Sequence, residues 1–262
     1  MKCKLDKYYT KTKTVVKCLE SVDLHKYDLI IEPSAGSGQF MKHLHGTRVI
    51  GVDIQPDSKE IIQKDFLDSN SEFFDIKPSD TVACVGNPPF GKNSRLAVDF
   101  FNHSAKFCDT IAFILPKTFR KTSIVNRLDP NFHLVKEVEI PADSFYTSYK
   151  DSYEVPAVWQ VWERREEKRQ KKKVILDHPD FSFIAEKHHA KFLIQRVGAN
   201  AGKTHQDFSK SKSSHYLITP HVPGVFETFT KINWEKTSKY NTAGNPSITK
   251  QDVIIQYEKH KQ

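Results

Sequence analysis

Long apolar runs are missing from this sequence of 262 residues. No stretch approaches the roughly 20 apolar residues that cross a membrane as a helix. The first ten residues, MKCKLDKYYT, lack the apolar segment of a secretory signal. We therefore expect a protein with no membrane segment that is not secreted and stays intracellular, in the cytoplasm or the nucleus.

Cysteine is also scarce, with four in the whole chain. None of them forms a Cys-x-x-Cys pair, which argues against a zinc site, and we expect no metal. Cys84 and Cys108 lie in apolar runs and are expected to be small buried hydrophobic residues. Few, scattered cysteines suit a reducing compartment.

Acidic residues are outnumbered, with 32 Asp and Glu against 40 Lys and Arg, which gives a net charge of +8. Such a balance favours a polyanionic partner such as nucleic acid. A soluble surface with no such role is the other interpretation, and the charge alone does not separate the two. The oligomeric state is open.

Short β-rich runs bounded by turn residues alternate with helical patterns in the first part of the chain. The strands are expected at 27–33, 48–54, 80–87, 109–116, 132–140 and 155–163, with a short third strand ending at Asp65, and the helices at 11–22, 39–44 and 94–107. This alternation predicts an α/β fold: a Rossmann-like, doubly wound, mostly parallel seven-stranded sheet. Only a loop joins the last two strands, which predicts an antiparallel hairpin at the sheet edge.

The charged run RREEKRQKKK at 164–173 has no apolar face. We interpret it as a solvated linker between a domain at 1–163 and a C-terminal extension at 174–262. Within this extension, 192–197 and 215–220 resemble strands, and 198–214 is a polar, basic loop. The extension is either a small α+β subdomain that grips nucleic acid or a lid that only packs on the domain.

The segment IIEPSAGSGQF at 30–40 places small residues between a strand and a helical pattern. Such residues let the backbone approach a ligand closely at a helix N-terminus. The segment lacks the Gly-Lys-Ser/Thr ending of a triphosphate loop and the full spacing of a dinucleotide fingerprint. A tight turn without a ligand would need the same glycines.

Two carboxylates follow the second and third expected strands. Asp53 could accept two hydrogen bonds from a ribose diol, or serve as a turn residue or helix cap. Asp65 could accept from an adenine amine while Phe66 stacks on the ring, and a solvent-exposed Asp is the alternative.

The fourth expected strand ends at the sequence Asn87-Pro88-Pro89-Phe90, since neither proline can donate to a sheet ladder. A nucleobase amine is a poor nucleophile, so an enzyme that alkylates it must hold both of its N–H groups. The Asn87 side-chain carbonyl and the Pro88 main-chain carbonyl could each accept one, while Phe90 stacks on the base and Pro89 keeps the turn stiff. A rigid strand-ending turn is the alternative.

Together these segments resemble class I S-adenosylmethionine-dependent amino-methyltransferases, above all the adenine N6 enzymes with an NPPF motif. The resemblance covers about residues 5–162 and implies methyl transfer that yields S-adenosylhomocysteine. A Tyr/Phe-Thr motif before the first helix is similar to KYYTK at 7–11, although Thr10 could also cap that helix. The residues it implies for the cofactor are Tyr9, Thr10, Glu32, Pro33, Ser34, Ala35, Gly36, Gly38, Asp53, Ile54, Asp65, Phe66 and Asn87.

Other residues are candidates for contact with the substrate. The basic charge agrees with nucleic acid, and DNA is placed slightly ahead of RNA. A protein-glutamine methyltransferase and a non-catalytic nucleic-acid-binding relative are the alternatives. The candidates for substrate contact are Phe90, Lys117, Phe145, Tyr146, Tyr149, Lys150, Arg196 and Lys203. The aromatic residues among them could equally pack the sheet edge, and the basic residues could be solvated.

Overall fold

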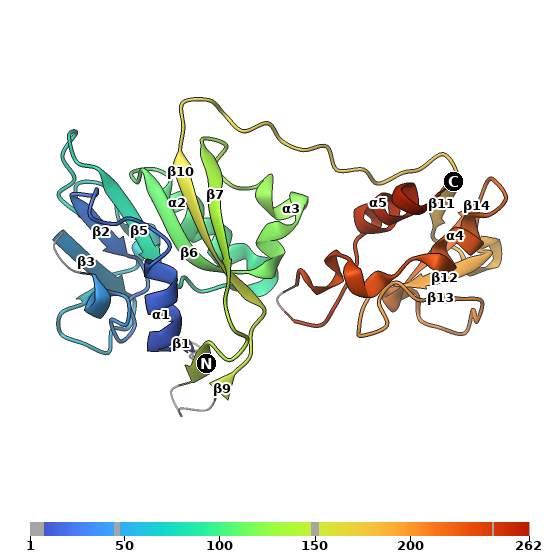
Figure 1. The fold of residues 1–262 in the computed structure, drawn as a ribbon, viewed down its shortest axis with the longest axis horizontal. Coiled ribbons are helices and arrows are strands. Elements are labelled where there is room, and N and C mark those ends of the chain that lie inside the picture. Colours follow the sequence, from blue (N-terminus) through green and yellow to red (C-terminus); the bar gives the residue numbers. More distant parts are fainter. Residues whose placement is uncertain (1–7, 45–47, 148–151, 243, 262) are drawn as a thin grey trace. The chain divides into compact units, whose positions relative to one another are not determined.

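The computed structural model describes residues 8–44, 48–147, 152–242 and 244–261, with the backbone alone at 152 and 153. The chain divides into two compact units, Met1–Lys171 and Lys172–Gln262 (Figure 1). The N-terminal unit carries 26 Lys and Arg against 24 Asp and Glu, whereas the C-terminal unit carries 14 against 8. Most of the positive excess therefore lies in the C-terminal unit. No helix in the described ranges is both long and apolar enough to cross a membrane.

A seven-stranded sheet forms the centre of the N-terminal unit. From edge to edge its strands are β4 (Ile62–Gln63), β3 (Arg48–Asp53), β2 (Leu29–Glu32), β5 (Val82–Gly86), β6 (Thr110–Pro116), β10 (Ala157–Arg164) and β7 (Phe132–Glu139). Neighbouring strands are parallel, except that β10 is antiparallel to both β6 and β7. The predicted α/β fold with a mostly parallel seven-stranded sheet is confirmed.

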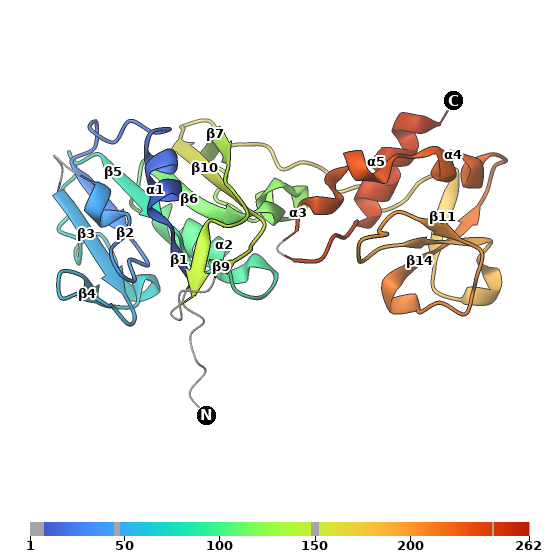
Figure 2. The same ribbon diagram turned by 60° about the horizontal axis from the view of Figure 1, so that its bottom comes forward.

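Alternate residues of the central strands are buried on opposite faces of this sheet. Leu29 and Ile31 belong to the core that includes α2 (Arg95–Ser104), whereas Ile30 belongs to the core that includes α1 (Thr12–Leu19). Figures 1 and 2 show the two helices on opposite faces. Because both faces are covered, the strands are continuous apolar runs, which is why they stand out in the sequence.

The remaining helical segments of this unit are short: η1 (Met41–His43), η2 (Phe66–Asp68), η3 (Lys92–Ser94), η4 (Lys117–Arg120) and α3 (Thr122–Val125). The helix expected at 39–44 is therefore a single 3-10 turn, which ends where the Leu44 backbone becomes extended.

A second, three-stranded antiparallel sheet joins the start of the described chain to a distant loop. It consists of β1 (Tyr8–Thr10), β8 (Phe145–Thr147) and β9 (Ser152–Tyr153). Tyr9 pairs with Tyr146, and Thr10 pairs with Phe145. This pairing places the residues before α1 beside the loop between β7 and β10, a contact that local patterns do not predict.

The charged run at 164–173 was interpreted as fully solvated, and this is wrong for Arg164 and Arg169, which are half-buried. The Arg164 guanidinium donates to the carbonyl oxygens of Ala105 and Cys108, and it lies over the Phe132 ring. Ala105 follows α2, where carbonyl groups lack partners within the helix, so the arginine satisfies them. Arg169 likewise donates to the Phe132 carbonyl at 3.1 Å.

The C-terminal unit is an α+β subdomain with a four-stranded antiparallel sheet in the order β11-β14-β12-β13. Its elements are β11 (Phe181–Ile184), η5 (Lys187–His189), β12 (Phe192–Gln195), β13 (Thr204–His205), η6 (Lys212–Ser214), β14 (His215–Pro220), α4 (Val225–Lys231), η7 (Trp234–Lys236), η8 (Ser238–Tyr240) and α5 (Lys250–His260). The strands expected at 192–197 and 215–220 correspond to β12 and β14. The core of this unit is rich in aromatic residues and includes Phe181, Phe192, Phe229 and Tyr257.

Candidate active site

The parallel strands β2, β3 and β5 end at the same edge of the main sheet. Ligands of open α/β sheets bind outside such carboxyl ends. Three of the segments singled out in the sequence follow these strands: the turn at 33–38, Asp53, and residues 87–90. The topology therefore brings them together, as expected.

The turn after β2 is anchored on β3 by its own backbone. The Ala35 N–H donates to the Val52 carbonyl at 3.0 Å, and the Gly36 N–H donates to Asp53 Oδ2 at 2.8 Å. Gly36 and Gly38 have φ of +52° and +73°, a region that glycine adopts without steric cost. The Ser37 hydroxyl in this turn is buried with no partner among the described residues. The turn is thus tight, and it contains a polar group that lacks a partner.

Asp53 supports two neighbouring backbone segments at once. Its Oδ2 accepts from Gly36, and its Oδ1 accepts from the Gln55 N–H at 2.7 Å. The bond to Gln55 is the turn role considered from the sequence. A carboxylate has about four acceptor positions, so each oxygen keeps one for a further donor. The side chain is half-buried, which leaves it accessible to a diol.

Asn87 is held on both sides by predicted site residues. Its side-chain amide donates to Thr10 Oγ1 at 3.2 Å, and its main-chain carbonyl accepts from the Ser34 hydroxyl at 3.0 Å. The other amide atom, Asn87 Oδ1, is buried and has no partner in the described part of the chain. A buried unpaired acceptor costs about 1–3 kcal/mol, so it is an unusual feature for a residue with a purely structural role.

Thr10 does not cap α1. The N-cap position of that helix is Lys11, and no side chain caps it. The Thr10 hydroxyl is buried and instead accepts from the Asn87 amide.

The three residues after Asn87 differ in burial. Pro88 is buried, Pro89 is exposed, and Phe90 is half-buried and packs against both cores of the N-terminal unit. Just beyond them, Asn93 and Ser94 have φ of +54° and +59°, which is uncommon for residues with a side chain. Strained backbone of this kind clusters at functional sites.

Tyr9 lies against the glycine turn. A Cβ atom built on Gly36 would be 3.6 Å from the Tyr9 ring, and the Tyr9 hydroxyl donates to Asp57 Oδ2 at 2.6 Å. Its ring stacks on Tyr146 with centroids 5.3 Å apart. Burial and the neighbouring Asp57 carboxylate both raise the pKa of Tyr9. Asp57 carried no signal in the sequence, because it lies in an irregular loop after β3.

Two aromatic predictions need correction. Phe66 is 2% exposed, and its ring packs against Phe100 with centroids 5.3 Å apart, so it offers no open face to an adenine ring. Phe145 is 1% exposed and belongs to the core on the α1 face, in agreement with the alternative that the aromatic residues pack the sheet edge.

Asp65 caps η2 by accepting from the Leu67 N–H at 2.9 Å. Ile54 is 53% exposed and remains available for contact.

The other residues of the turn are largely internal. Pro33 and Ala35 are buried, and Glu32 is 2% exposed. Glu32 Oε2 accepts from the Met41 N–H at 3.1 Å, which ties the end of β2 to η1. Burial raises the pKa of Glu32 well above its usual range. Glu32 therefore stabilises the turn from inside the protein, and its carboxyl group is not exposed to a ligand.

This buried carboxyl gives a testable pH dependence. The folded chain retains the Glu32 proton to higher pH than the unfolded chain does. The contribution of the protonated carboxyl group to the free energy of unfolding is therefore complete below the unfolded pKa, about 4.3, and is lost as pH rises. Urea unfolding between pH 4 and 9 should show Glu32→Gln gaining stability relative to the wild type as pH rises. The exposed Glu60→Gln serves as the control. An identical pH profile for Glu32→Gln and the wild type would contradict this assignment.

The charge of Lys117, a proposed substrate contact, is partly neutralised. Its ammonium group pairs with Glu139 at 3.1 Å. Tyr149 and Lys150 lie outside the described residues. No cluster of three or more His, Cys, Asp or Glu side chains suited to a metal ion is found in the ranges that the structure describes.

No protein-family model matches this chain, and no curated protein matches it. Among solved structures, the 23S rRNA methyltransferase ErmE aligns at 19% identity and a TM-score of 0.43, over 62% of this chain and 71% of its own. A modification subunit of a proposed type I restriction enzyme from Vibrio vulnificus YJ016 aligns at 16% and 0.46, over 61% of this chain and 45% of its own. The magnesium protoporphyrin IX methyltransferase of Synechocystis PCC 6803 aligns at 13% and 0.40, over 58% and 77%. All three TM-scores are below 0.5.

Proposed function

We propose that the N-terminal unit transfers a methyl group from S-adenosylmethionine to the N6 amine of adenine in nucleic acid, with DNA placed ahead of RNA. The observation that carries this proposal is the carbonyl oxygen of Asn87 just after β5, which is buried and has no partner in the described part of the chain. It lies on a segment that is bonded to the β2 turn through Ser34. This oxygen would accept one N–H of the substrate amine.

The turn and Asp53 would hold the cofactor. Asp53 keeps acceptor positions for a ribose diol, and Asp65 and Ile54 would contact the adenine end. Tyr9 and Thr10 would lie toward the methionine end, with the Tyr9 ring against Gly36 of the turn. When bound, the cofactor supplies an electrophilic methyl group, and its transfer to the amine leaves S-adenosylhomocysteine and one proton.

Asn87 and Pro88 would position the amine. The Asn87 side-chain carbonyl and the Pro88 main-chain carbonyl accept its two N–H groups, which directs the nitrogen lone pair away from both acceptors. Thr10 and Ser34 keep Asn87 in place, so little reorganisation is needed. Phe90 would stack on the base, and the stiff Pro88-Pro89 turn would keep that ring in position.

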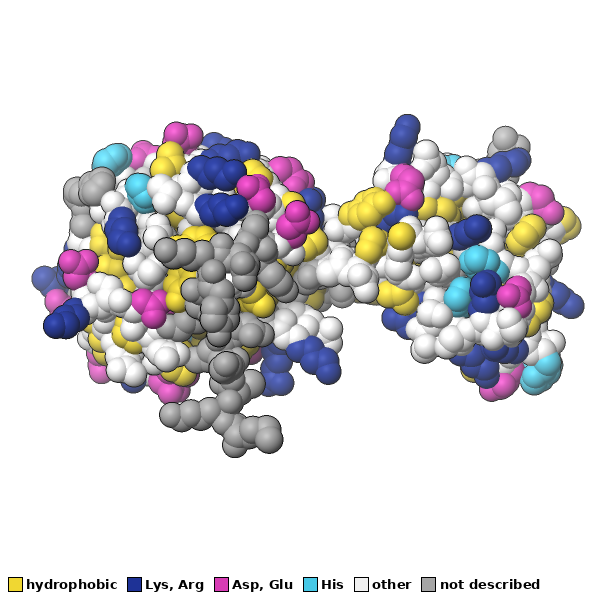
Figure 3. Space-filling model, turned by 90° about the horizontal axis from the view of Figure 1, so that it is seen from below, with side chains coloured by type: hydrophobic (Ala, Val, Ile, Leu, Met, Phe, Trp, Pro, Cys, Tyr) yellow, Lys and Arg dark blue, Asp and Glu magenta, His cyan; other side chains and the backbone are white. Residues whose placement is uncertain are grey.

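The C-terminal unit would grip the nucleic acid. It has 14 basic against 8 acidic residues, and Figure 3 shows its basic side chains spread over the face in view. Arg196 and Lys203 are the substrate contacts proposed there. A chain that ends at Lys173 should lose affinity for nucleic acid in a filter-binding assay, and full retention of affinity would rule out the gripping role.

The proposal is tested by transfer of tritiated methyl groups to duplex DNA, single-stranded DNA, structured RNA and protein, followed by mass spectrometry of the nucleosides. We expect N6-methyladenine in nucleic acid. Label found only in protein would favour the glutamine alternative. Calorimetry that shows no heat with S-adenosylmethionine would favour a non-catalytic binding protein.

A further inference from the structure

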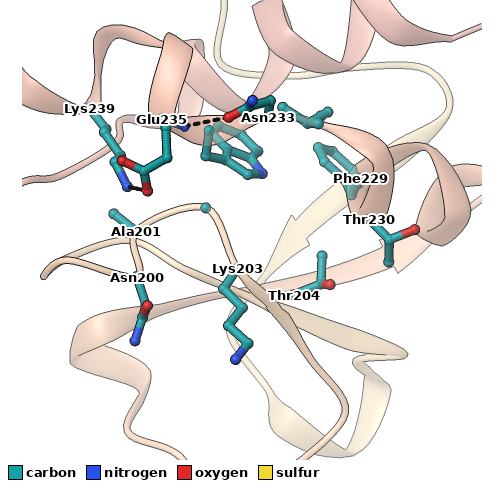
Figure 4. A pocket seen from close by; sticks show the side chains of 12 residues that line it. Asn200, Ala201, Lys203, Thr204, Phe229, Thr230, Asn233, Glu235 and Lys239 are labelled. Atoms are coloured by element: carbon teal, nitrogen blue, oxygen red, sulfur yellow. Dashed lines mark hydrogen bonds and ion pairs between the residues drawn. The ribbon is translucent and has the colours of Figure 1, made fainter.

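The C-terminal unit contains a cavity that the proposed methyl transfer does not use. Its volume is about 410 Å³, within the range of small-ligand sites (about 300–1,000 Å³). It lies between the loop after β12 and the segment from α4 to η8 (Figure 4). Its lining includes Lys203, Thr204, Phe229, Thr230, Trp234 and Glu235.

Trp234 is one of the residues that line this cavity. Its side chain is 8% exposed, and its indole N–H is buried with no acceptor in the described residues. Gly202 fixes the ring from the opposite loop, because a Cβ atom on Gly202 would lie 2.2 Å from it. The indole is therefore rigidly placed, and its N–H makes no hydrogen bond within the described part of the chain.

Lys203 provides an unpaired positive charge at the same cavity. Of the three lysines in the loop at 198–214, Lys210 pairs with Asp207 at 3.8 Å and Lys212 pairs with Glu186 at 3.3 Å. Lys203 is exposed and makes no ion pair with the described residues. The loop thus presents a single free ammonium group to a ligand in the cavity.

Glu235 is the carboxylate that lines the cavity, and it is already neutralised. It accepts from the Lys239 ammonium and from the Tyr240 hydroxyl. Figure 4 shows Asn200 and Lys203 extending from the loop around Ala201 away from Glu235 and Lys239. With Glu235 and Lys239 paired to each other, Lys203 is the charged lining residue that has no ion pair in the described residues, which favours an anionic ligand.

We propose that this cavity binds one unpaired nucleotide of the nucleic-acid strand, with a phosphate on Lys203 and a base acceptor on the Trp234 N–H. The inference rests on the proposed function, because a strand held by the C-terminal unit is what supplies the nucleotide. Phe229 and Trp234 form the apolar side of the cavity, and the hydroxyl groups of Thr204 and Thr230 add polar contacts for the sugar or base.

Fluorescence anisotropy of the full chain with 5′-fluorescein 12-mers of single-stranded DNA and RNA tests this. Lys203→Ala should weaken binding about 5- to 10-fold. It should also lower the slope of log affinity against log salt concentration by about 1, the value for one phosphate contact. Trp234→Phe keeps an aromatic ring but removes the N–H, and it should weaken binding about 3- to 10-fold. Lys259→Ala, which removes the same charge from the exposed surface of α5, should change binding less than about 2-fold.

Equal losses for Lys203→Ala and Lys259→Ala would mean diffuse attraction and overturn the proposal. Wild-type affinity in Trp234→Phe would also overturn the proposal. Binding of AMP at the cavity that is as tight as binding of the 12-mers would overturn it as well. A wild-type chain that binds no oligonucleotide would overturn the proposed function as well. Binding by the wild type that neither variant weakens would overturn this inference alone.

Discussion

Asn87→Ala should lower the rate of methyl transfer by about 10²- to 10³-fold, the size expected when one preorganised polar contact to a reacting group is lost. The change removes the buried Oδ1 acceptor, which has no partner among the residues that the structure describes, and it also removes the amide that donates to Thr10. Single-turnover transfer of a tritiated methyl group to adenine-containing DNA and RNA measures the loss. Cofactor affinity from calorimetry should stay within a few-fold of the wild type, because Asp53 and the β2 turn are unchanged.

Asn87→Asp is the matched variant. It keeps an acceptor of the same shape, and the Thr10 hydroxyl can donate to it, so we expect more activity than in Asn87→Ala. Thr10→Val removes only the support of the amide, and it should lower the rate by a smaller factor. If Asn87→Ala matched the wild type on every nucleic acid tested, the assigned role would be wrong.

Asp53→Ala should weaken S-adenosylmethionine binding by about 10- to 100-fold, since hydrogen bonds to a charged group contribute about 1.5–3 kcal/mol each. The variant loses the acceptors proposed for the ribose diol. It also releases the Gly36 and Gln55 N–H groups, so the turn that would face the cofactor becomes less ordered. Isothermal calorimetry with S-adenosylmethionine and S-adenosylhomocysteine measures the change.

Asp53→Asn separates these two contributions. It keeps one carbonyl acceptor but loses the charge, so its affinity should fall between those of the wild type and Asp53→Ala. At saturating cofactor, the rate of methyl transfer should recover in both variants, in contrast to Asn87→Ala. Unchanged affinity in Asp53→Ala would exclude the ribose contact.

The main sheet could be predicted because its strands are buried on both faces. Runs such as Leu29–Glu32 and Thr110–Pro116 are continuously apolar and end at turn residues, so their positions and type follow from local composition. Their parallel order places strand ends together, which is why the turn at 33–38, Asp53 and Asn87 lie at one edge of the sheet. These features depend on short segments of chain, and short segments are what a sequence pattern records.

The errors concern residues whose environment is set by distant partners. Phe66 and Phe145 stand beside site residues in the sequence, yet both rings point into cores formed by other elements. Arg164 and Arg169 belong to a hydrophilic run, but carbonyl groups more than 35 residues away bind them. Charge and hydrophobicity along the chain do not show which of several aromatic or basic neighbours turns inward.

The order of apolar runs and turn residues in this chain was enough to predict an α/β sheet and to place Asp53 and Asn87 at the ends of its strands. Tertiary contacts determined the features that the sequence did not predict. It paired β1 with β8, which brings Thr10 to Asn87 and Tyr9 to the glycine turn, and it enclosed the Trp234 indole beside Lys203. The physical reason is that burial and hydrogen-bond partners arise from contacts between distant segments, whereas strand and turn propensities are properties of neighbouring residues.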